Sequence, residues 1–138
     1  MDLLEKNNRS NSQNKKGFFT IEKRKHPRFL VDLPLNYSRV GDTGIYGGMI
    51  ANISEGGFLA FIHQRLEIGD LLRIEIIYLR EFEVETIRAV AKIVWSDLSS
   101  LKNSEEGRYG LQFLSIDEKD LLRLKNYLKD ISTVRLKF

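Results

Sequence analysis

Residues 51–58 have the sequence Ala-Asn-Ile-Ser-Glu-Gly-Gly-Phe, which predicts the end of a β-strand followed by a glycine turn. Side chains alternate along a strand, so Asn52 and Ser54 are expected to project from one face. Gly56 and Gly57 then interrupt the strand, because glycine tolerates positive φ and lets the backbone approach a ligand closely. The stretch therefore predicts a short polar ledge at a strand end, with open backbone beside it.

Alternating apolar residues on both sides of this stretch predict further strands. The expected strands cover 33–37, 46–53, 58–62, 71–78, 84–95 and 109–113, with turns at 40–44 and 67–70. Pro34 makes the first of them an edge strand or the beginning of a strand, because proline cannot donate to a neighbour. In the second expected strand, 46–53, strict alternation would place Ile50 and Ile53 on opposite faces.

The hydrophobic period changes after the last strand. Ser115 and Glu118 have the spacing of a capping box. An amphipathic helix is expected to follow, ending near Asp130. Its apolar positions recur every three or four residues: Leu121, Leu124, Tyr127, Leu128 and Ile131. Six strands and one helix predict an all-β fold with a C-terminal helix, as an antiparallel barrel or a sandwich, in which the helix covers an opening or forms an interface.

Composition limits the class of protein. The chain has 138 residues, 42% hydrophobic and 30% charged, which suits one globular domain. Its apolar runs are shorter than the ~18 residues of a membrane span, and the N-terminus lacks the apolar segment of a signal peptide. The chain has no cysteine, which excludes disulfides and thiolate chemistry. These features predict a cytoplasmic protein.

Positive charge is concentrated at the N-terminus. Residues 1–28 contain eight Lys or Arg and three acidic residues, whereas the rest of the chain contains 14 basic and 16 acidic residues. Residues 1–20 are polar and without periodicity, which predicts a mobile tail. A basic arm of this kind suits nucleic acid, an anionic surface or a phosphorylated small ligand.

Catalytic and metal-binding patterns are lacking in the sequence. The two histidines, His26 and His63, have no spacing typical of a metal site. Ser54 lacks the preceding glycine of a nucleophile elbow. We therefore expect no catalytic residues, no metal and no cofactor, and a binding protein rather than an enzyme.

Two short motifs have the chemistry of a nucleotide site. Arg24 and Arg28 are four residues apart, and Pro27 disfavours a helix at the residue before it. Two guanidiniums on one side of an extended segment can bind phosphate bidentately and stack on a purine ring. Asn52 and Ser54 supply the donors and acceptors that a purine edge requires.

The combination of these motifs resembles the PilZ domain family. R-x-x-x-R is followed, 24 residues after the second arginine, by N-x-S-x-x-G. The resemblance extends to Lys-Ile-Val-Trp at 92–95 and Gly-Leu-Gln-Phe at 110–113. It covers a domain at 21–115 that includes the arginine-bearing arm, leaving 1–20 as a tail and 116–138 as a helix and tail packed on the barrel.

The resemblance implies both a fold and a ligand. PilZ domains are six-stranded antiparallel barrels that bind the bacterial second messenger cyclic di-GMP. The arginines would hold phosphate and stack on guanine, the second motif would surround a guanine edge, and Lys23 would influence whether one or two ligand molecules bind. The implied ligand-binding residues are Lys23, Arg24, Arg28, Asn52, Ser54, Gly56 and Gly57.

The resulting functional hypothesis is a second-messenger receptor. Its N-terminal arm would become ordered on binding, and its output would pass to an unidentified downstream protein through the arm or the helix. Two alternatives are a PilZ-like adaptor without ligand binding and a basic-tailed barrel that binds nucleic acid. The second is disfavoured because the expected barrel is net acidic.

Overall fold

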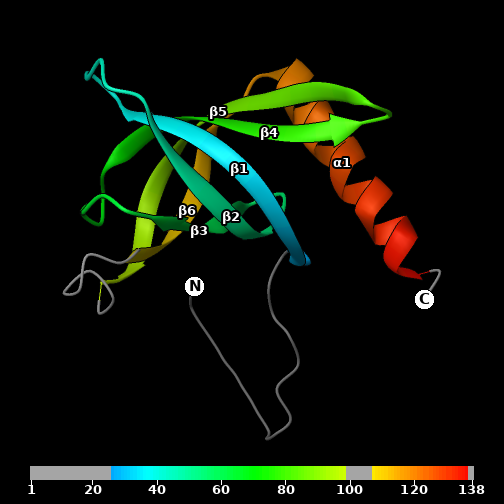
Figure 1. Cartoon of the computed structure of the whole chain (residues 1–138), viewed down its shortest axis with the longest axis horizontal. Coiled ribbons are helices and arrows are strands. Elements are labelled where there is room, and N and C mark those ends of the chain that lie inside the picture. Colours follow the sequence, from blue (N-terminus) through cyan, green and yellow to red (C-terminus); the bar gives the residue numbers. More distant parts are fainter. Residues whose placement is uncertain (1–25, 99–106, 137–138) are drawn as a thin grey trace, which may run out of the picture.

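The structure of the chain, a computed structural model, describes residues 26–98 and 107–136. These residues form six strands and one helix (Figure 1). The elements are β1 (Phe29–Arg39), β2 (Tyr46–Ile53), β3 (Gly57–Ile62), β4 (Leu71–Arg80), β5 (Glu83–Asp97), β6 (Gly107–Ser115) and α1 (Glu118–Leu136). Residues 1–20, predicted to be a mobile tail, lie outside the described part of the chain.

The strands close into a barrel in the order β1-β2-β3-β6-β5-β4. Every neighbouring pair is antiparallel, and β1 closes the barrel by pairing with both β2 and β4. The predicted antiparallel barrel is confirmed, and the alternative of a sandwich is excluded.

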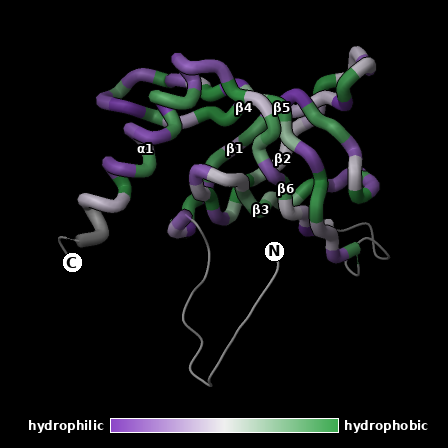
Figure 2. The backbone as a smooth tube through the Cα atoms, turned by 180° about the vertical axis from the view of Figure 1, so that it is seen from behind, coloured by the Kyte–Doolittle hydropathy of each residue, from purple (hydrophilic) through white to green (hydrophobic). Residues whose placement is uncertain are grey.

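Alternate residues of each long strand point inward and fill the barrel interior. Leu72, Ile74 and Ile76 of β4 are buried and alternate with more exposed neighbours. β5 shows the predicted pattern in the same way, because every second residue from Ile87 to Ile93 is buried. Figure 2 shows hydrophobic stretches along the strands and hydrophilic stretches at several of the connections. Binary alternation therefore accounts for most of the core.

Pro34 lies inside β1 rather than at its beginning. β1 starts five residues earlier at Phe29, so the prediction of a strand beginning is wrong. The pairing explains why proline is tolerated there: Pro34 pairs with Met49 of β2, and the pairing of β1 with β4 begins only at Leu35. On the β4 side, Pro34 therefore lies at a local edge where no ladder hydrogen bond is needed.

β2 contains an irregularity that the alternation did not predict. Ile50 and Ile53 are both fully buried, whereas strict alternation places them on opposite faces. The β2–β3 register shifts between Ile50 and Asn52, as in a β-bulge. One extra residue in a strand reverses the direction of the side chains that follow. This bulge brings both isoleucines into the core.

β4 and β5 continue beyond the barrel as a two-stranded ribbon. The pairing with β1 ends at Ile76, and β6 meets β5 only from Val90 onward. α1 covers the edge of β5 that β6 leaves open: Arg88 N donates to Asp120 Oδ1 (3.2 Å), and Arg123 donates to the Thr86 carbonyl oxygen (3.0 Å). Side chains of the helix thus satisfy backbone groups of an otherwise exposed strand edge.

The beginning of α1 differs from the prediction. Ser115 belongs to β6 and pairs with Val90, so it cannot cap the helix. Asp117 caps it instead, because its Oδ1 accepts a 2.9 Å hydrogen bond from Asp120 N. This backbone bond holds the pKa of the Asp117 carboxyl below its ordinary value. The helix also ends at Leu136, beyond the predicted end near Asp130.

Candidate functional site

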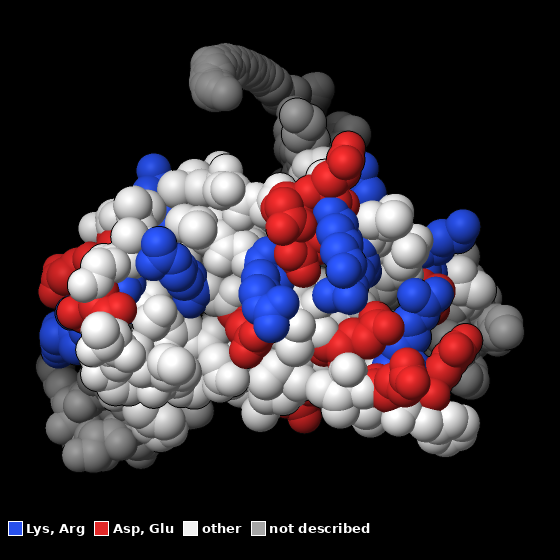
Figure 3. Space-filling model, turned by 90° about the horizontal axis from the view of Figure 1, so that it is seen from above, with Lys and Arg blue, Asp and Glu red and all other residues white. Residues whose placement is uncertain are grey.

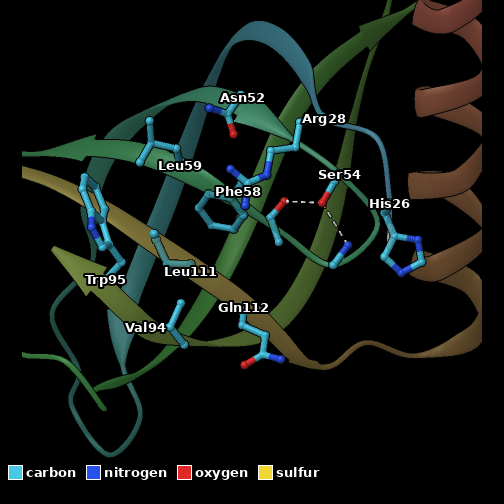
Figure 4. A pocket seen from close by; sticks show the side chains of 13 residues that line it. His26, Arg28, Asn52, Ser54, Phe58, Leu59, Val94, Trp95, Leu111 and Gln112 are labelled. Atoms are coloured by element: carbon cyan, nitrogen blue, oxygen red, sulfur yellow. Dashed lines mark hydrogen bonds between the residues drawn. The ribbon is translucent and has the colours of Figure 1, made fainter. Parts of the chain in front are cut away.

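A cleft of about 680 Å³ opens at the rim of the barrel where β2 turns into β3 (Figure 4). Residues preceding β1 and residues of β2, β3, β5 and β6 contribute to its wall. The lining residues are His26, Arg28, Asn52, Ser54, Gly56, Gly57, Phe58, Leu59, Val94, Trp95, Gly110, Leu111 and Gln112. Arg28 and four predicted residues of the second motif therefore lie on one cleft.

Ser54 organises the turn between β2 and β3. Its buried hydroxyl donates to the Gly57 carbonyl oxygen (3.3 Å) and accepts from Gly56 N (3.1 Å). Its backbone N also donates to the Gly57 carbonyl oxygen (2.8 Å). The hydroxyl hydrogen is thus already used within the turn, and only acceptor capacity is left for a ligand.

The two glycines of the motif have different surroundings. A Cβ on Gly57 would lie 2.0 Å from the Leu111 carbonyl oxygen, so the approach of β3 to β6 requires glycine at this position. Gly56 is more open, because the nearest atom to its virtual Cβ is His26 Cδ2 at 3.4 Å. Gly57 therefore has a packing role within the barrel, while Gly56 lines the cleft with its N–H donated to Ser54 Oγ and its carbonyl oxygen accepting from Phe113 N.

The cleft contains one arginine, Arg28, whose charge is unpaired within 26–98 and 107–136. The Arg28 guanidinium forms no hydrogen bond or ion pair with any other residue in the described ranges. The described lining also contains neither Asp nor Glu. An exposed guanidinium without a neighbouring carboxylate attracts an anion, and its planar fork matches phosphate oxygens.

Asn52 supplies the polar edge of the cleft. It pairs with Leu30 of β1 and Leu59 of β3, which fixes its backbone in the middle of three strands. Its half-buried side chain faces the cleft in Figure 4. In the part of the chain that the structure describes, the amide makes no hydrogen bond, so both its donor and its acceptor are available.

The opposite wall is apolar and centres on Trp95, the single tryptophan of the chain. Trp95 is 45% exposed, and the Arg108 guanidinium lies 5.9 Å from its ring centroid. Arg108 is held in turn by an ion pair with Asp97 at 2.5 Å. A Cβ on Gly110 would lie 3.2 Å from the Trp95 Cβ, so glycine leaves room for the indole. The wall provides a flat aromatic surface on which a purine base can stack.

Sequence reasoning did not include Trp95 among the site residues. Trp95 lies two residues after the buried Ile93, so alternation would place its side chain in the core. The β5–β6 register shifts between these two residues, and this shift turns the indole outward. The Trp95–Gly110 pairing was visible in the sequence only as two separate fragments of the family resemblance.

Lys23 and Arg24 lie outside the described residues. Of the two arginines predicted to act together, the structure therefore describes only Arg28. The roles of Lys23 and Arg24 stay predictions.

The described ranges contain neither a metal-binding cluster nor a helix that could span a membrane. Across 26–98 and 107–136, no three His, Cys, Asp or Glu side chains are grouped so that they could hold a metal ion. The described helix is too polar to span a membrane.

Comparison with known proteins identifies the family. The sequence model of the PilZ domain matches residues 22–130. No curated protein matches the chain.

Solved structures with similar folds include the following three. The inhibitor of motility MotI/DgrA from Bacillus subtilis shares 20% identity at a TM-score of 0.66, over 82% of this chain and 52% of that protein. The PilZ domain of YcgR from Escherichia coli, solved with c-di-GMP, shares 14% identity at a TM-score of 0.60, over 84% and 96%. MrkH from K. pneumonia, solved as a c-di-GMP complex, shares 20% identity at a TM-score of 0.63, over 82% and 53%.

This chain spans about half the length of the inhibitor of motility and of MrkH. At these identities the likeness concerns the fold. The sequence match and the closed six-stranded barrel agree, and the chain belongs to the PilZ domain family.

Proposed function

We propose that the protein is a receptor for cyclic di-GMP and that it binds the ligand in the cleft at the β2–β3 turn. The observation that carries the proposal is Arg28, a cation without a partner among the described residues, in a cleft whose described lining has no carboxylate. YcgR and MrkH, which share the fold, were solved with c-di-GMP.

Each side of the ligand meets a group of matching chemistry in this proposal. Arg28, together with Arg24, binds phosphate and stacks on guanine. The Asn52 amide bonds to a guanine edge, and Gly56, which has no side chain, lets the base approach the turn shaped by Ser54 closely. Trp95 provides the apolar surface for a base on the opposite wall.

The basic arm is the element that responds to the ligand. An anion bound between the arm and the barrel rim holds the arm against the barrel, which costs conformational entropy and needs strong charged contacts. Lys23, beside Arg24, influences whether one ligand molecule or two bind. The ordered arm, or the outer face of α1, then meets a downstream protein in the cytoplasm, and the protein catalyses no reaction itself.

A binding titration tests the proposal. Cyclic di-GMP is titrated by calorimetry and by the fluorescence of Trp95, which reports on the cleft because it is the single tryptophan. Arg28→Ala is expected to weaken binding at least about tenfold. The matched control is Arg73→Ala, which removes an exposed arginine of β4 that does not line the cleft.

The alternative ligands are included in the same titration. GTP and single-stranded DNA are added at two salt concentrations, because DNA binding driven by the basic arm weakens steeply with salt. On the face shown in Figure 3, acidic and basic side chains are interspersed, whereas nucleic-acid binding favours a broad basic surface. Tight, salt-sensitive DNA binding without a response to cyclic di-GMP would contradict the proposal.

A further inference from the structure

His26 lies in the wall of the same cleft as Arg28, two residues before it (Figure 4). The residue is half-buried, and its ring rests near the turn after β2: a Cβ on Gly56 would lie 3.4 Å from His26 Cδ2. The imidazole therefore occupies the side of the cleft where the arm meets the barrel rim.

The ring nitrogens of His26 have no protein partner in the described part of the chain. Among the described residues, the charged groups on the segments beside it are Arg28, two residues later, and Glu55, which is exposed in the β2–β3 turn and does not line the cleft. β6 contributes the neutral Gln112. A proton on the imidazole would thus have a cationic neighbour and no carboxylate in the described lining, so its natural counter-ion is a ligand phosphate.

We propose that His26 is a further ligand-binding residue, whose protonated imidazole donates a hydrogen bond to a phosphate of the bound anion, so that binding takes up a proton. The inference rests on the proposed function and extends it, because it makes the affinity for the ligand depend on pH. Histidine is the side chain whose charge ordinarily changes between pH 5 and 8.

The direction of the pH effect follows from linkage. A phosphodiester stays ionised across this range, and a nearby anion favours the charged form of an imidazole. The complex therefore holds more protons than the free protein and ligand together. Affinity for the ligand is therefore expected to rise as pH falls from 7.5 to 5.5.

A purely structural role for His26 makes a different prediction. If the ring only packs against Gly56, its replacement alters affinity equally at every pH. The chain offers a matched control, because His63 is its only other histidine. His63 is exposed in the connection between β3 and β4 and does not line the cleft.

The experiment measures the dissociation constant for cyclic di-GMP from pH 5.5 to 7.5 in the wild type, His26→Gln, His26→Arg and His63→Gln. The wild type and His63→Gln are expected to bind about fivefold to tenfold more tightly at pH 5.5 than at pH 7.5. His26→Gln loses this dependence. His26→Arg carries a permanent charge, so it also loses the dependence and binds at pH 7.5 about as tightly as the wild type does at pH 5.5.

Calorimetry in two buffers of different ionisation enthalpy adds an independent readout. The wild type is expected to take up a fraction of a proton near pH 6.5 and His26→Gln none, with thermal unfolding confirming that the variant is folded. If the wild type binds with the same affinity at all pH values and takes up no proton, the role proposed for His26 is overturned, while the proposed function stands. A pH dependence retained in His26→Gln also overturns it. Absence of binding at every pH overturns the proposed function, and this inference with it.

Discussion

The Tyr78 hydroxyl donates a 2.7 Å hydrogen bond to Glu85 Oε1, directly across the ribbon of β4 and β5. The ring of Tyr78 also packs on Tyr127 of α1, with 5.1 Å between the centroids. Burial, followed by the bond to Glu85, raises the pKa of Tyr78 to about 12. This one side chain therefore connects both strands of the ribbon to the helix.

The stability of the protein is expected to fall as pH rises from 10 to 12. The unfolded tyrosine ionises near pH 10 and the folded one near 12, so the contribution of Tyr78 is complete below pH 10 and is lost above it. The loss by pH 11 is on the order of 1 kcal/mol. Urea unfolding at pH 8 and pH 11 measures it, and Tyr78→Phe should lose less stability between these pH values than the wild type.

The turn at the end of the ribbon is strained. Glu81 and Phe82 connect β4 to β5 with φ of 53° and 76°, a region that disfavours residues other than glycine, and Phe82 is fully exposed. The double substitution Glu81→Asn and Phe82→Gly supplies the residues that a two-residue hairpin with positive φ prefers. It should raise the free energy of unfolding by about 1 kcal/mol, measured by urea unfolding.

Phe82→Ala is the control for this turn. It removes the same exposed ring but keeps a Cβ at positive φ, so it should leave stability nearly unchanged. A gain in Phe82→Ala as large as in the double variant would show that ring exposure, and not backbone strain, limits stability.

Gly57→Ala should be among the most destabilising small changes in the barrel. Its Cβ would meet the Leu111 carbonyl oxygen at 2.0 Å, and backbone atoms on two paired strands cannot move apart without loss of pairing. We expect a loss of roughly 3 kcal/mol or more in urea unfolding. At Gly47 the virtual Cβ is 3.8 Å from its nearest neighbour, so Gly47→Ala should cost far less. Equal losses in the two variants would contradict the steric argument.

The Ser54 hydroxyl should act through the turn that it shapes. Ser54→Ala removes its two hydroxyl hydrogen bonds, and we expect a loss of about 1–2 kcal/mol in stability together with weaker binding of cyclic di-GMP. Ser54→Thr keeps a hydroxyl and should restore most of both. Full affinity in Ser54→Ala, measured by calorimetry, would show that the cleft does not depend on this turn.

The barrel was predictable where the pattern is local. Leu72, Ile74 and Ile76 alternate with polar neighbours, and this alternation reports which side faces the core whatever the rest of the chain does. The second motif was predictable for a similar reason, because Asn52 and Ser54 lie close together in sequence and line the cleft in the structure.

The features that were missed depend on how one strand pairs with the next, and not on the sequence of a single strand. The irregularities beside Ile50 and Ile93 place one extra residue in a strand, and the partner strand determines where it falls. Alternation alone therefore assigned Ile53 to the wrong face and gave no reason to place Trp95 in the site. The cap of α1 was missed because β6 extends to Ser115 and leaves Asp117 as the first residue free to cap.

The bulge in β2 separates two requirements that a regular strand would tie together. Because of it, Ile50 and Ile53 both face the packed interior, while Asn52 between them lines the opening at the rim. The half-buried Asn52 side chain can consequently be exchanged without repacking the interior, unlike the buried Ser54 and Phe58. Substitutions at Asn52 would therefore change the polar edge of the cleft while the closed barrel stays the same.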